Sequence, residues 1–274
     1  MTRDTYQKRL ARHLMYYKRH RLGVLANGEF THKGVSRAYG HVLPRDLKWL
    51  NVPEPFRREI RDYLERRECV QPHQYFHHLN SSQALAFALF YPYLTHCPRV
   101  LARAVGMKEV TTIDPMFELV PHAEEGTNVD VAWRCGGGTV YCEVKLSERE
   151  FGAAKADTRH RQKLETIYRP VLRGQVDDVL LEESAFFKHY QILRNLWLAA
   201  RERHDRDQVV FLLPRANALL AEQLASVLDQ VDRSLCARVH VVYIEQMLAR
   251  LAKDGSACGL AWYARMLQEK YVPA

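Results

Sequence analysis

Three charged residues stand in a short stretch whose other residues are typical of two β-strands. The stretch TNVDVAWRCGGGTVYCEVKLSEREFG runs from Thr127 to Gly152 and contains Asp130, Glu143 and Lys145. Strand interiors disfavour Asp, Glu and Lys, so three of them in one hairpin need a compensating role. Side chains alternate along a strand, which puts Glu143 and Lys145 on one face. If the RCGGG turn pairs the strands so that Asp130 faces the same way, the three groups converge.

Two carboxylates with a lysine beside them are suited to metal-dependent hydrolysis of a phosphodiester. Carboxylate oxygens suit Mg²⁺, a hard cation that keeps several water molecules. The ion polarises the phosphodiester and lowers the pKa of a bound water, which the lysine can orient or deprotonate. The alternative is a pair of exposed salt bridges on a solvated sheet face, because Glu-x-Lys alone is common on strands. The acid on the preceding strand, after the EGTN turn, makes the combination considerably more specific.

The spacing of Asp130 and Glu143-Val144-Lys145 resembles the D…(D/E)-x-K signature of the PD-(D/E)XK nuclease superfamily. One departure is Val129, where many members carry a proline, although that proline is often absent. Four blocks also resemble, in the same order, motifs of one bacterial branch of restriction endonucleases. They are LNSSQALAFALFYPYL (79–94), TNVDVAWR (127–134), EVKLSEREFG (143–152) and YQILRN (190–195).

The resemblance implies an α/β core with a central mixed sheet and hydrolysis of DNA that depends on Mg²⁺, with Mn²⁺ as a substitute. Asp130 and Glu143 would be metal ligands, and Lys145 would serve the attacking water. Many members carry a further acid upstream, for which Glu118 is our first candidate and Glu125 the second. We expect Glu125, like Asp114 before Pro115, to be an ordinary surface acid.

Gln191 and Arg194 lie three residues apart, so one helix face carries both. We expect this pair to face the phosphate, where Arg194 would stabilise charge. The alternative is a polar helix face that pairs with Glu182 and Glu183.

Four further residues are candidates for supporting the site or contacting DNA. Asn128 shares the strand face of Asp130. Ser82 and Gln83 follow a helix cap at Asn80 or Ser81, and capping explains part of this motif. For Arg149, a phosphate contact competes with a salt bridge to its acidic neighbours. The four candidates are Ser82, Gln83, Asn128 and Arg149.

The hydrophobic pattern predicts an α/β fold with a central mixed sheet flanked by helices, plus a largely helical N-terminal region. The resemblance described above implies that this core is restriction-endonuclease-like. Residues 1–75 would form the basic N-terminal region and residues 76–274 the nuclease-like domain, unless the two form one continuous domain. Helices are predicted at 2–17, 54–68, from the cap at Asn80 or Ser81 to Pro92, at 100–105, 184–203 and 217–232, and at the C-terminus. Strands are predicted within 109–121, 127–134, 139–147, 207–214 and 237–244, and residues 22–47 are expected to be irregular or a hairpin.

Charge and composition indicate the class of partner. The 274 residues carry a net charge of +8, with the excess concentrated between Arg3 and Arg67. A positive field favours nucleic acid, whereas a merely solvated basic surface is the plainer reading. No apolar stretch is long enough to span a bilayer, and the basic N-terminus lacks the apolar run of a secretory signal, so we expect a soluble, cytoplasmic protein.

Cysteines and histidines give no strong metal motif. The six cysteines form no C-x-x-C pair, which predicts reduced, mostly buried thiols rather than a zinc ribbon. Cys69, His73 and His77 are spaced four apart, but Pro72 argues against an unbroken helix there, so we interpret these histidines as structural or surface residues.

The favoured hypothesis is an Mg²⁺-dependent DNA endonuclease of restriction type, with the basic N-terminal region contacting phosphates. The alternatives are a DNA-binding protein that keeps the fold but does not cut, and a structural α/β protein with a salt-bridged hairpin. A homodimer stays open, because double-strand cutters often pair two sites. The sequence also leaves open the recognition sequence, the methylation dependence and the choice between duplex and single strands.

Overall fold

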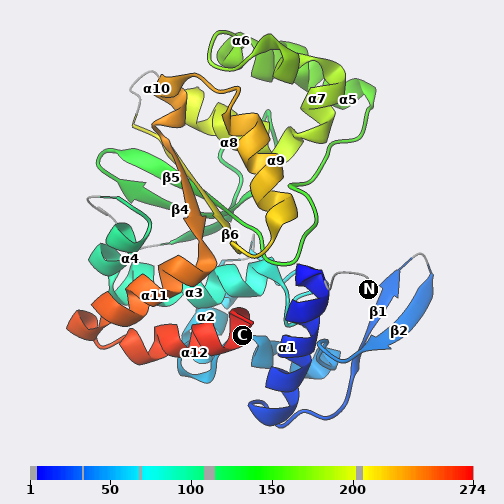
Figure 1. The fold of residues 1–274 in the computed structure, drawn as a ribbon, viewed down its shortest axis with the longest axis vertical. Helices are drawn as coiled ribbons and strands as arrows, with labels where there is room; N and C mark the ends of the chain where they lie inside the picture. The colour runs from blue at the N-terminus through cyan, green and yellow to red at the C-terminus, as the bar shows by residue number, and fades with distance from the viewer. Residues whose placement is uncertain (1–4, 33, 68–69, 108–114, 202–205, 274) are drawn as a thin grey trace.

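A five-stranded mixed sheet runs through the centre of the molecule (Figure 1). The computed structural model describes residues 5–32, 34–67, 70–107, 115–201 and 206–273. The strand order is β3-β4-β5-β6-β7, with an antiparallel meander from β3 to β5 and parallel pairing from β5 to β7. The strands are β3 (Met116–Leu119), β4 (Val129–Cys135), β5 (Gly138–Val144), β6 (Gln208–Leu213) and β7 (Val239–Tyr243). The predicted α/β fold with a central mixed sheet is therefore confirmed.

The turn between β4 and β5 depends on glycine. Gly136 and Gly137 have φ angles of +56° and +85°, which glycine adopts without steric cost. The turn sets the register in which Ala132 lies opposite Tyr141 and Val131 opposite Cys142. This register decides which side chains of the two strands meet.

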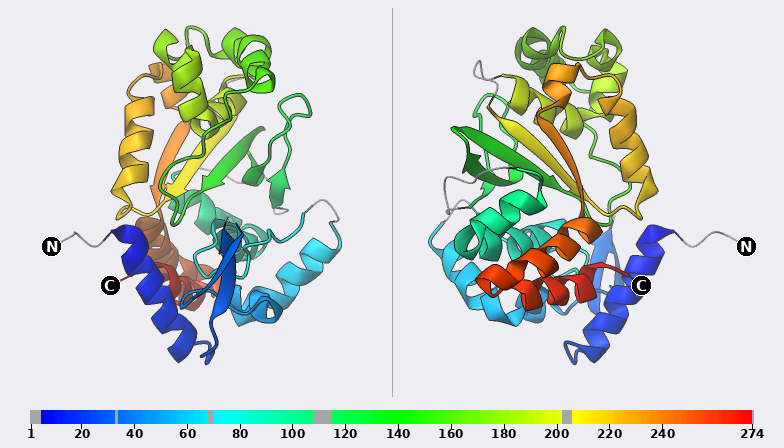
Figure 2. Two further views of the ribbon diagram at one scale, coloured as in Figure 1. Left: turned by 90° about the vertical axis from the view of Figure 1, so that its right-hand side faces the viewer. Right: turned by 60° about the vertical axis from the view of Figure 1, so that its left-hand side comes forward.

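Helices cover both faces of the sheet (Figures 1 and 2). Val131, Cys142 and Val144 pack into one hydrophobic cluster with the N-terminal helices and with α3, α11 and α12. Ala132 and Tyr141 pack into a second cluster with helices α6 to α10. The helices of the first layer are α1 (Tyr6–His20), η1 (Arg45–Asn51), α2 (Glu54–Glu65), α3 (Ser82–His96), α4 (Pro98–Ala104), α11 (Ile244–Asp254), η4 (Gly255–Cys258) and α12 (Ala261–Tyr271). Those of the second are α5 (Thr158–Lys163), η2 (Leu164–Tyr168), α6 (Arg169–Leu172), η3 (Asp178–Leu181), α7 (Glu183–Lys188), α8 (Tyr190–Ala200), α9 (Ala218–Leu228) and α10 (Arg233–Cys236).

The N-terminal region packs against the end of the chain. Residues 22–47 contain the expected hairpin, formed by β1 (Gly28–His32) and β2 (Val35–Tyr39). Leu10 and Leu14 of α1 belong to the same hydrophobic cluster as Leu267 and Tyr271 of α12. Lys270 of α12, which is buried, donates a hydrogen bond to the Asn51 side chain at 2.6 Å. One hydrophobic core thus joins segments from both ends of the sequence.

Helix α3 begins as predicted but ends later than predicted. Ser81 is its N-cap, and the Ser81 side chain accepts a hydrogen bond from the Ala84 N–H. The helix passes through Pro92, where we expected it to stop, and continues to His96. A proline leaves the carbonyl four residues earlier without its helical donor. Here that carbonyl, Ala88 O, accepts a hydrogen bond of 2.8 Å from the Tyr263 hydroxyl, so tertiary structure satisfies the freed group.

The single helix predicted at 184–203 is two helices. Helix α7 ends before His189 and α8 begins at Tyr190. The loop after β5 accounts for the break, because it binds backbone groups on both sides of it. Ala154 N–H donates to Phe187 O at 2.9 Å, and Gln191 N–H donates to Gly152 O at 3.3 Å.

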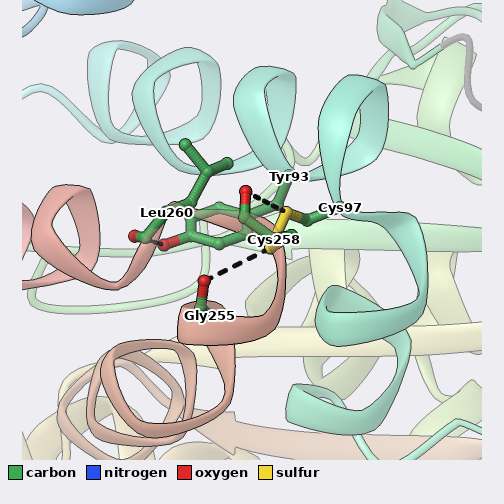
Figure 3. Close-up of a disulfide and its surroundings, with 5 residues drawn as sticks. All are labelled: Tyr93, Cys97, Gly255, Cys258 and Leu260. Carbon is green, nitrogen blue, oxygen red and sulfur yellow. Dashed lines mark hydrogen bonds between the residues drawn. A yellow bond between two sulfur atoms is a disulfide. The ribbon is translucent and has the colours of Figure 1, made fainter.

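Two cysteines are joined, which corrects the prediction of reduced thiols throughout. Cys97 and Cys258 form a disulfide, with their Cα atoms 6.1 Å apart, between the end of α3 and η4 (Figure 3). Cys135 and Cys142 are buried as expected, and Cys236 is half-buried, whereas Cys69 lies outside the described residues. None of the helices in the described ranges combines the length and apolar composition that a membrane-spanning segment needs.

Candidate active site

Three acids stand in one row across neighbouring strands. Phe117 and Leu119 of β3 lie opposite Val131 and Val129 of β4, so Glu118 falls across from Asp130. The pairing of β4 with β5 in turn places Asp130 across from Glu143 at the end of the meander. The register thereby brings together Asp130, Glu143 and the upstream acid Glu118.

Glu143 is the most deeply embedded of the three acids, with 3% of its surface exposed. Its carboxylate lies 2.8 Å from Lys145 Nζ, forms an ion pair with Arg194 and accepts a hydrogen bond from Asn195 at 3.3 Å. Burial alone would raise the pKa of Glu143, but Lys145 and Arg194 outweigh it and lower the pKa below its usual value. Glu143 is therefore held as a carboxylate by two buried cations.

Asp130 is in the opposite electrostatic situation. Its carboxylate accepts a hydrogen bond of 2.7 Å from the backbone N–H of Val144. Burial and then the neighbouring charge of Glu143 raise the pKa of Asp130 well above its usual value, although Lys145 opposes the shift. The site therefore disfavours the ionised form of Asp130.

Glu118 is held in an unusual backbone conformation. It has a φ of +49°, which non-glycine residues adopt uncommonly. Its carboxylate accepts a hydrogen bond of 2.9 Å from Gln83 and another from Asn128. Burial, followed by the charge of Glu143, raises its pKa. Gln83 and Asn128, which we expected to support the site or contact DNA, thus fix the position of this acid.

Lys145 is oriented by two partners. Besides its ion pair with Glu143, its Nζ donates to the side-chain oxygen of Gln191 at 2.7 Å. Gln191 and Arg194 lie on α8, as predicted, and each contacts a charged residue of β5 or its end. The alternative pairing with Glu183 is wrong, because Glu183 pairs with Arg161 at 2.9 Å.

The segment SEREFG after β5 ties the hairpin to α3 and α8. The Asn80 side chain donates to the Ser147 hydroxyl at 2.8 Å, and Phe151 is fully buried. Gly152 has a φ of +61°, and a Cβ there would lie 2.6 Å from the Gln191 side chain. Arg149, by contrast, is exposed and does not line the groove described next.

A groove opens beside two of the three acids. Its volume is about 670 Å³, and Glu118, Asp130 and Gln191 are among the residues that line it. The predicted Ser82 also lines it, at the start of α3. Its lining residues are Gln71, His73, Tyr75, His78, Asn80, Ser81, Ser82, Gln83, Glu118, Asn128, Asp130, Glu148 and Gln191.

The donor atoms of the three acids suit a hard cation. They are carboxylate oxygens, which Mg²⁺ prefers over nitrogen or sulfur. In the described ranges, no three His, Cys, Asp or Glu side chains already converge as a metal-binding group. The pKa of Asp130 is raised first by burial and then by repulsion from Glu143, and a bound cation would offset both effects by stabilising the carboxylate. The residues present therefore fit Mg²⁺ chemically.

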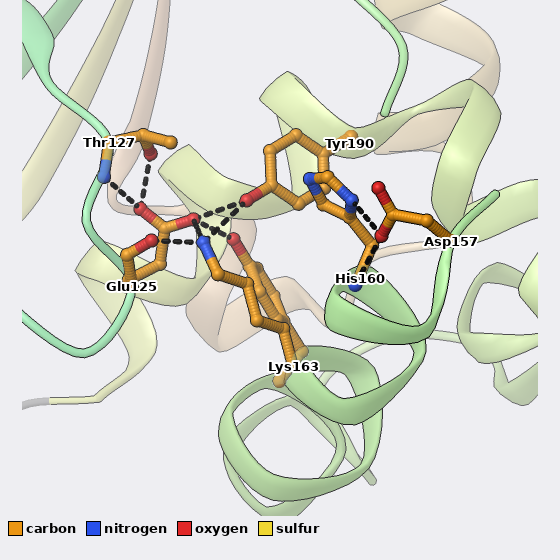
Figure 4. A network of polar contacts seen from close by, with 7 residues as sticks. Glu125, Thr127, Asp157, His160, Lys163 and Tyr190 are labelled. Carbon is orange, nitrogen blue, oxygen red and sulfur yellow. Dashed lines mark hydrogen bonds and ion pairs between the residues drawn. The ribbon is translucent and has the colours of Figure 1, made fainter. Parts of the chain in front are cut away.

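Glu125 is not the surface acid that we expected, because only 2% of it is exposed. Its carboxylate accepts hydrogen bonds from Thr127 N–H at 3.0 Å and Tyr168 at 2.8 Å, and also from Tyr190 (Figure 4). Lys163 Nζ lies 3.4 Å from it. Burial raises its pKa, but these hydrogen bonds and Lys163 outweigh burial and lower the pKa to about 2. Glu125 anchors helix α8 from behind the site, and Asp114 lies outside the described residues.

Asn195 is the site residue that our reading of the sequence missed. Its side chain donates to Glu143 at 3.3 Å and to the Gln191 carbonyl at 2.8 Å. A signal was present, because Asn195 lies four residues after Gln191 and so shares its helix face.

The whole site falls within one family match. A model of the family described as restriction endonuclease associating with ARP matches residues 11–272. No curated protein and no solved structure matches the chain significantly. Since the match covers nearly the entire sequence, the chain belongs to the family of restriction endonucleases associating with ARP.

Proposed function

We propose that this protein is an Mg²⁺-dependent endonuclease that hydrolyses DNA phosphodiester bonds. One observation carries the proposal: the register aligns Glu118, Asp130 and Glu143 in a row, with Lys145 ion-paired to the last of them. Two acids of the row, Glu118 and Asp130, line a groove of about 670 Å³, which gives a substrate access to them. The family match supports nuclease activity in general.

The three acids would hold the metal. Asp130 and Glu143 are the principal ligands in this proposal, and Glu118 is the third. Mg²⁺, when bound, would polarise the phosphodiester and lower the pKa of a water molecule. Gln83 and Asn128 keep Glu118 in place, and Val144 N–H fixes one oxygen of Asp130, so the donors are preorganised.

The two cations, Lys145 and Arg194, would orient the attacking water and stabilise negative charge. Lys145 can orient the attacking water, with Gln191 holding its ammonium in position at 2.7 Å. Arg194, buried against Glu143, keeps that carboxylate ionised and adds positive potential where negative charge grows on the phosphate.

The basic helices would contact the DNA backbone. Lys8, Arg9 and Arg19 on α1 and Arg58 and Arg61 on α2 are exposed. Helix α1 also begins beside the site, because Gln7 near its start contacts Glu148 O at 3.4 Å in the loop after β5. Phosphate contacts made from this region would give salt-dependent affinity.

A plasmid-cleavage assay with Mg²⁺ or Mn²⁺ tests the proposal. Asp130→Asn, Glu143→Gln and Lys145→Ala should each lower cleavage by about 10²-fold or more, as expected for groups that stabilise charge in the transition state. Glu124→Gln, which changes an exposed acid, is the matched control and should leave cleavage unchanged. Calorimetry should show Mn²⁺ binding that Asp130→Asn weakens. Cleavage that all three variants retain would refute the assigned roles.

A second candidate is a DNA-binding protein that does not cut. The observation that favours it is the saturation of Glu143, whose carboxylate already contacts Lys145, Arg194 and Asn195. A metal ion would have to share these oxygens. Salt-dependent DNA binding without cleavage, across several metals and both strand forms, would favour this second function.

A further inference from the structure

The groove is lined by two chemically different sets of residues. Besides the acids, its lining includes aromatic and imidazole rings: His73, Tyr75 and His78. The Tyr75 ring centroid lies 5.0 Å from that of His73 and 5.3 Å from that of His78. We call these three residues the ring wall. No role in the chemistry proposed above uses it.

The ring wall is rigidly supported. Phe30 of the β1–β2 hairpin packs edge-on against Tyr75 and His78, with centroids 5.1 and 5.2 Å apart. Behind it, the Asn51 side chain donates to His78 O at 2.6 Å, and Lys270 in turn donates to Asn51. A surface held this firmly can bind a flat ligand without ordering first.

His78 of the ring wall is uncharged at neutral pH. Burial, followed by the neighbouring His77 and His41, lowers the pKa of His78 to about 4, so its imidazole is neutral at pH 7. An uncharged imidazole is poorly suited to pairing with a phosphate and well suited to packing beside a heterocycle.

Two residues of the groove have hydrogen-bonding capacity to spare. His78 Nε2 and Asn80 Oδ1 are buried, and neither has a hydrogen-bond partner in the part of the chain that the structure describes. Buried polar atoms are usually paired, so a polar ligand that reached these two atoms would satisfy them. An imidazole nitrogen and an amide oxygen can together recognise the donor and acceptor edge of a base.

We propose that the ring wall binds an unpaired nucleobase of the nucleotide next to the scissile phosphate. The preferred substrate is then DNA that is single-stranded at the cleavage point, since a base inside a duplex cannot stack on Tyr75. The inference rests on the proposed function in one respect only, namely that cleavage takes place at the acids Glu118 and Asp130. The base-binding surface itself is independent of cleavage.

Fluorescence anisotropy on the full chain tests the subsite. Labelled single-stranded DNA, the same sequence as duplex, and a series with one abasic nucleotide at each position are titrated with Ca²⁺ in place of Mg²⁺. Gels confirm that the DNA stays intact. We expect tighter binding of the single strand, and one position at which base removal weakens binding by about 10-fold, the scale of one lost stacking contact.

Variants connect that position to the ring wall. Tyr75→Ala should weaken binding by a similar factor and make base removal at that position harmless, because both changes delete one contact. Tyr75→Phe keeps the ring and should behave as wild type. Trp262→Ala removes an aromatic side chain that is 45% exposed on α12, outside the groove lining and the basic helices, and serves as the control. If Tyr75→Ala fails to fold, the abasic series on the wild-type protein still shows whether one base is bound specifically.

The outcomes separate the two proposals. An abasic series that is flat in the wild type, or unchanged in Tyr75→Ala, overturns the subsite whether or not the protein cleaves. Base-dependent binding without cleavage in Mg²⁺ or Mn²⁺ supports the subsite and refutes the endonuclease. If the ring wall bound a phosphate instead, Tyr75→Ala would weaken DNA binding by the same factor whichever position is abasic. That result would also overturn the subsite. Absence of any DNA binding refutes both.

Discussion

Lys145 Nζ lies 2.8 Å from a carboxylate oxygen of Glu143, and both groups are buried. The pair is not symmetrical, because Glu143 has a second cation, Arg194, whereas the other hydrogen-bond partner of Lys145 is the neutral Gln191. Removing the lysine leaves a neutralised carboxylate, but removing the carboxylate leaves two buried cations. Breaking a buried pair so that charge is left uncompensated costs about 3–5 kcal/mol.

The first prediction follows from this asymmetry. Glu143→Gln should lower the free energy of unfolding by about 3 kcal/mol, and Lys145→Met should lower it by less than about half as much. Both should abolish cleavage. Urea denaturation followed by circular dichroism measures the difference, with the exposed Glu124→Gln as control. Equal losses from the two variants would contradict the assignment of Arg194 as the second partner.

The second prediction concerns Gly152. Its φ is +61° and an added Cβ would meet the Gln191 side chain at 2.6 Å, so Gly152→Ala should push Gln191 away from Lys145. Gly174 is a matched control, because its φ is +79° and nothing lies within 4 Å of an added Cβ. Both alanines should cost about 1 kcal/mol through backbone strain.

Only Gly152→Ala should also lower cleavage, because only it disturbs the partner of the proposed catalytic lysine. Comparing kcat for the two variants at matched folded fractions separates a loss of activity from a loss of stability. Equal activity in both variants would mean that the Gln191 contact does not matter for the chemistry.

The third prediction is a pH dependence of stability caused by Glu125. Its pKa in the folded protein is about 2, below its usual value of 4.5. The carboxylate therefore contributes stability that is fully present above about pH 4.5 and is lost as the pH falls toward 2. By linkage, a shift of this size corresponds to a contribution of roughly 3 kcal/mol.

Glu125→Gln should lower stability at pH 7 and flatten its decline between pH 5 and 2.5, as measured by urea unfolding at a series of pH values. Glu124→Gln, one residue earlier and exposed, should keep the wild-type profile. A Glu125→Gln profile parallel to that of the wild type would exclude this carboxylate as the source.

The fourth prediction concerns the Cys97–Cys258 disulfide, which closes a segment with a sequence separation of 161 residues. A cross-link over so long a loop restricts the unfolded chain strongly, and its loss typically costs roughly 2–5 kcal/mol. The Cys97→Ala/Cys258→Ala double variant should melt at lower temperature than wild type under non-reducing conditions. With reductant the two proteins should converge, and a difference that persists there would reflect packing instead. Non-reduced peptide mapping checks the pairing directly.

Alternation along the strands was enough to predict the convergence of Asp130, Glu143 and Lys145, because local geometry decides which face a strand residue occupies. The N-cap at Ser81 was likewise local. The passage of α3 through Pro92 was not predictable in this way, since it depends on Tyr263, which is distant in sequence. Local sequence patterns thus predict some features of the fold, whereas contacts between distant residues determine others.

The same division applies to the site. Glu125 reads as a surface acid until Tyr168 and Tyr190, far along the chain, surround it. The break between α7 and α8 depends on the loop at Gly152, and no propensity within 184–203 indicates it. For Glu125 and for this break, what escaped prediction was a hydrogen bond between groups far apart in sequence.

The link from Lys270 through Asn51 to the backbone of His78 has a consequence for protein synthesis. Helix α12 emerges from the ribosome long after the residues of the ring wall and of the acidic row. Until then, Asn51 lacks its buried ammonium partner and α1 lacks the apolar surface of Leu267 and Tyr271. A nascent chain therefore completes the support of the ring wall last, because the helix that holds Asn51 in place is the final helix of the sequence.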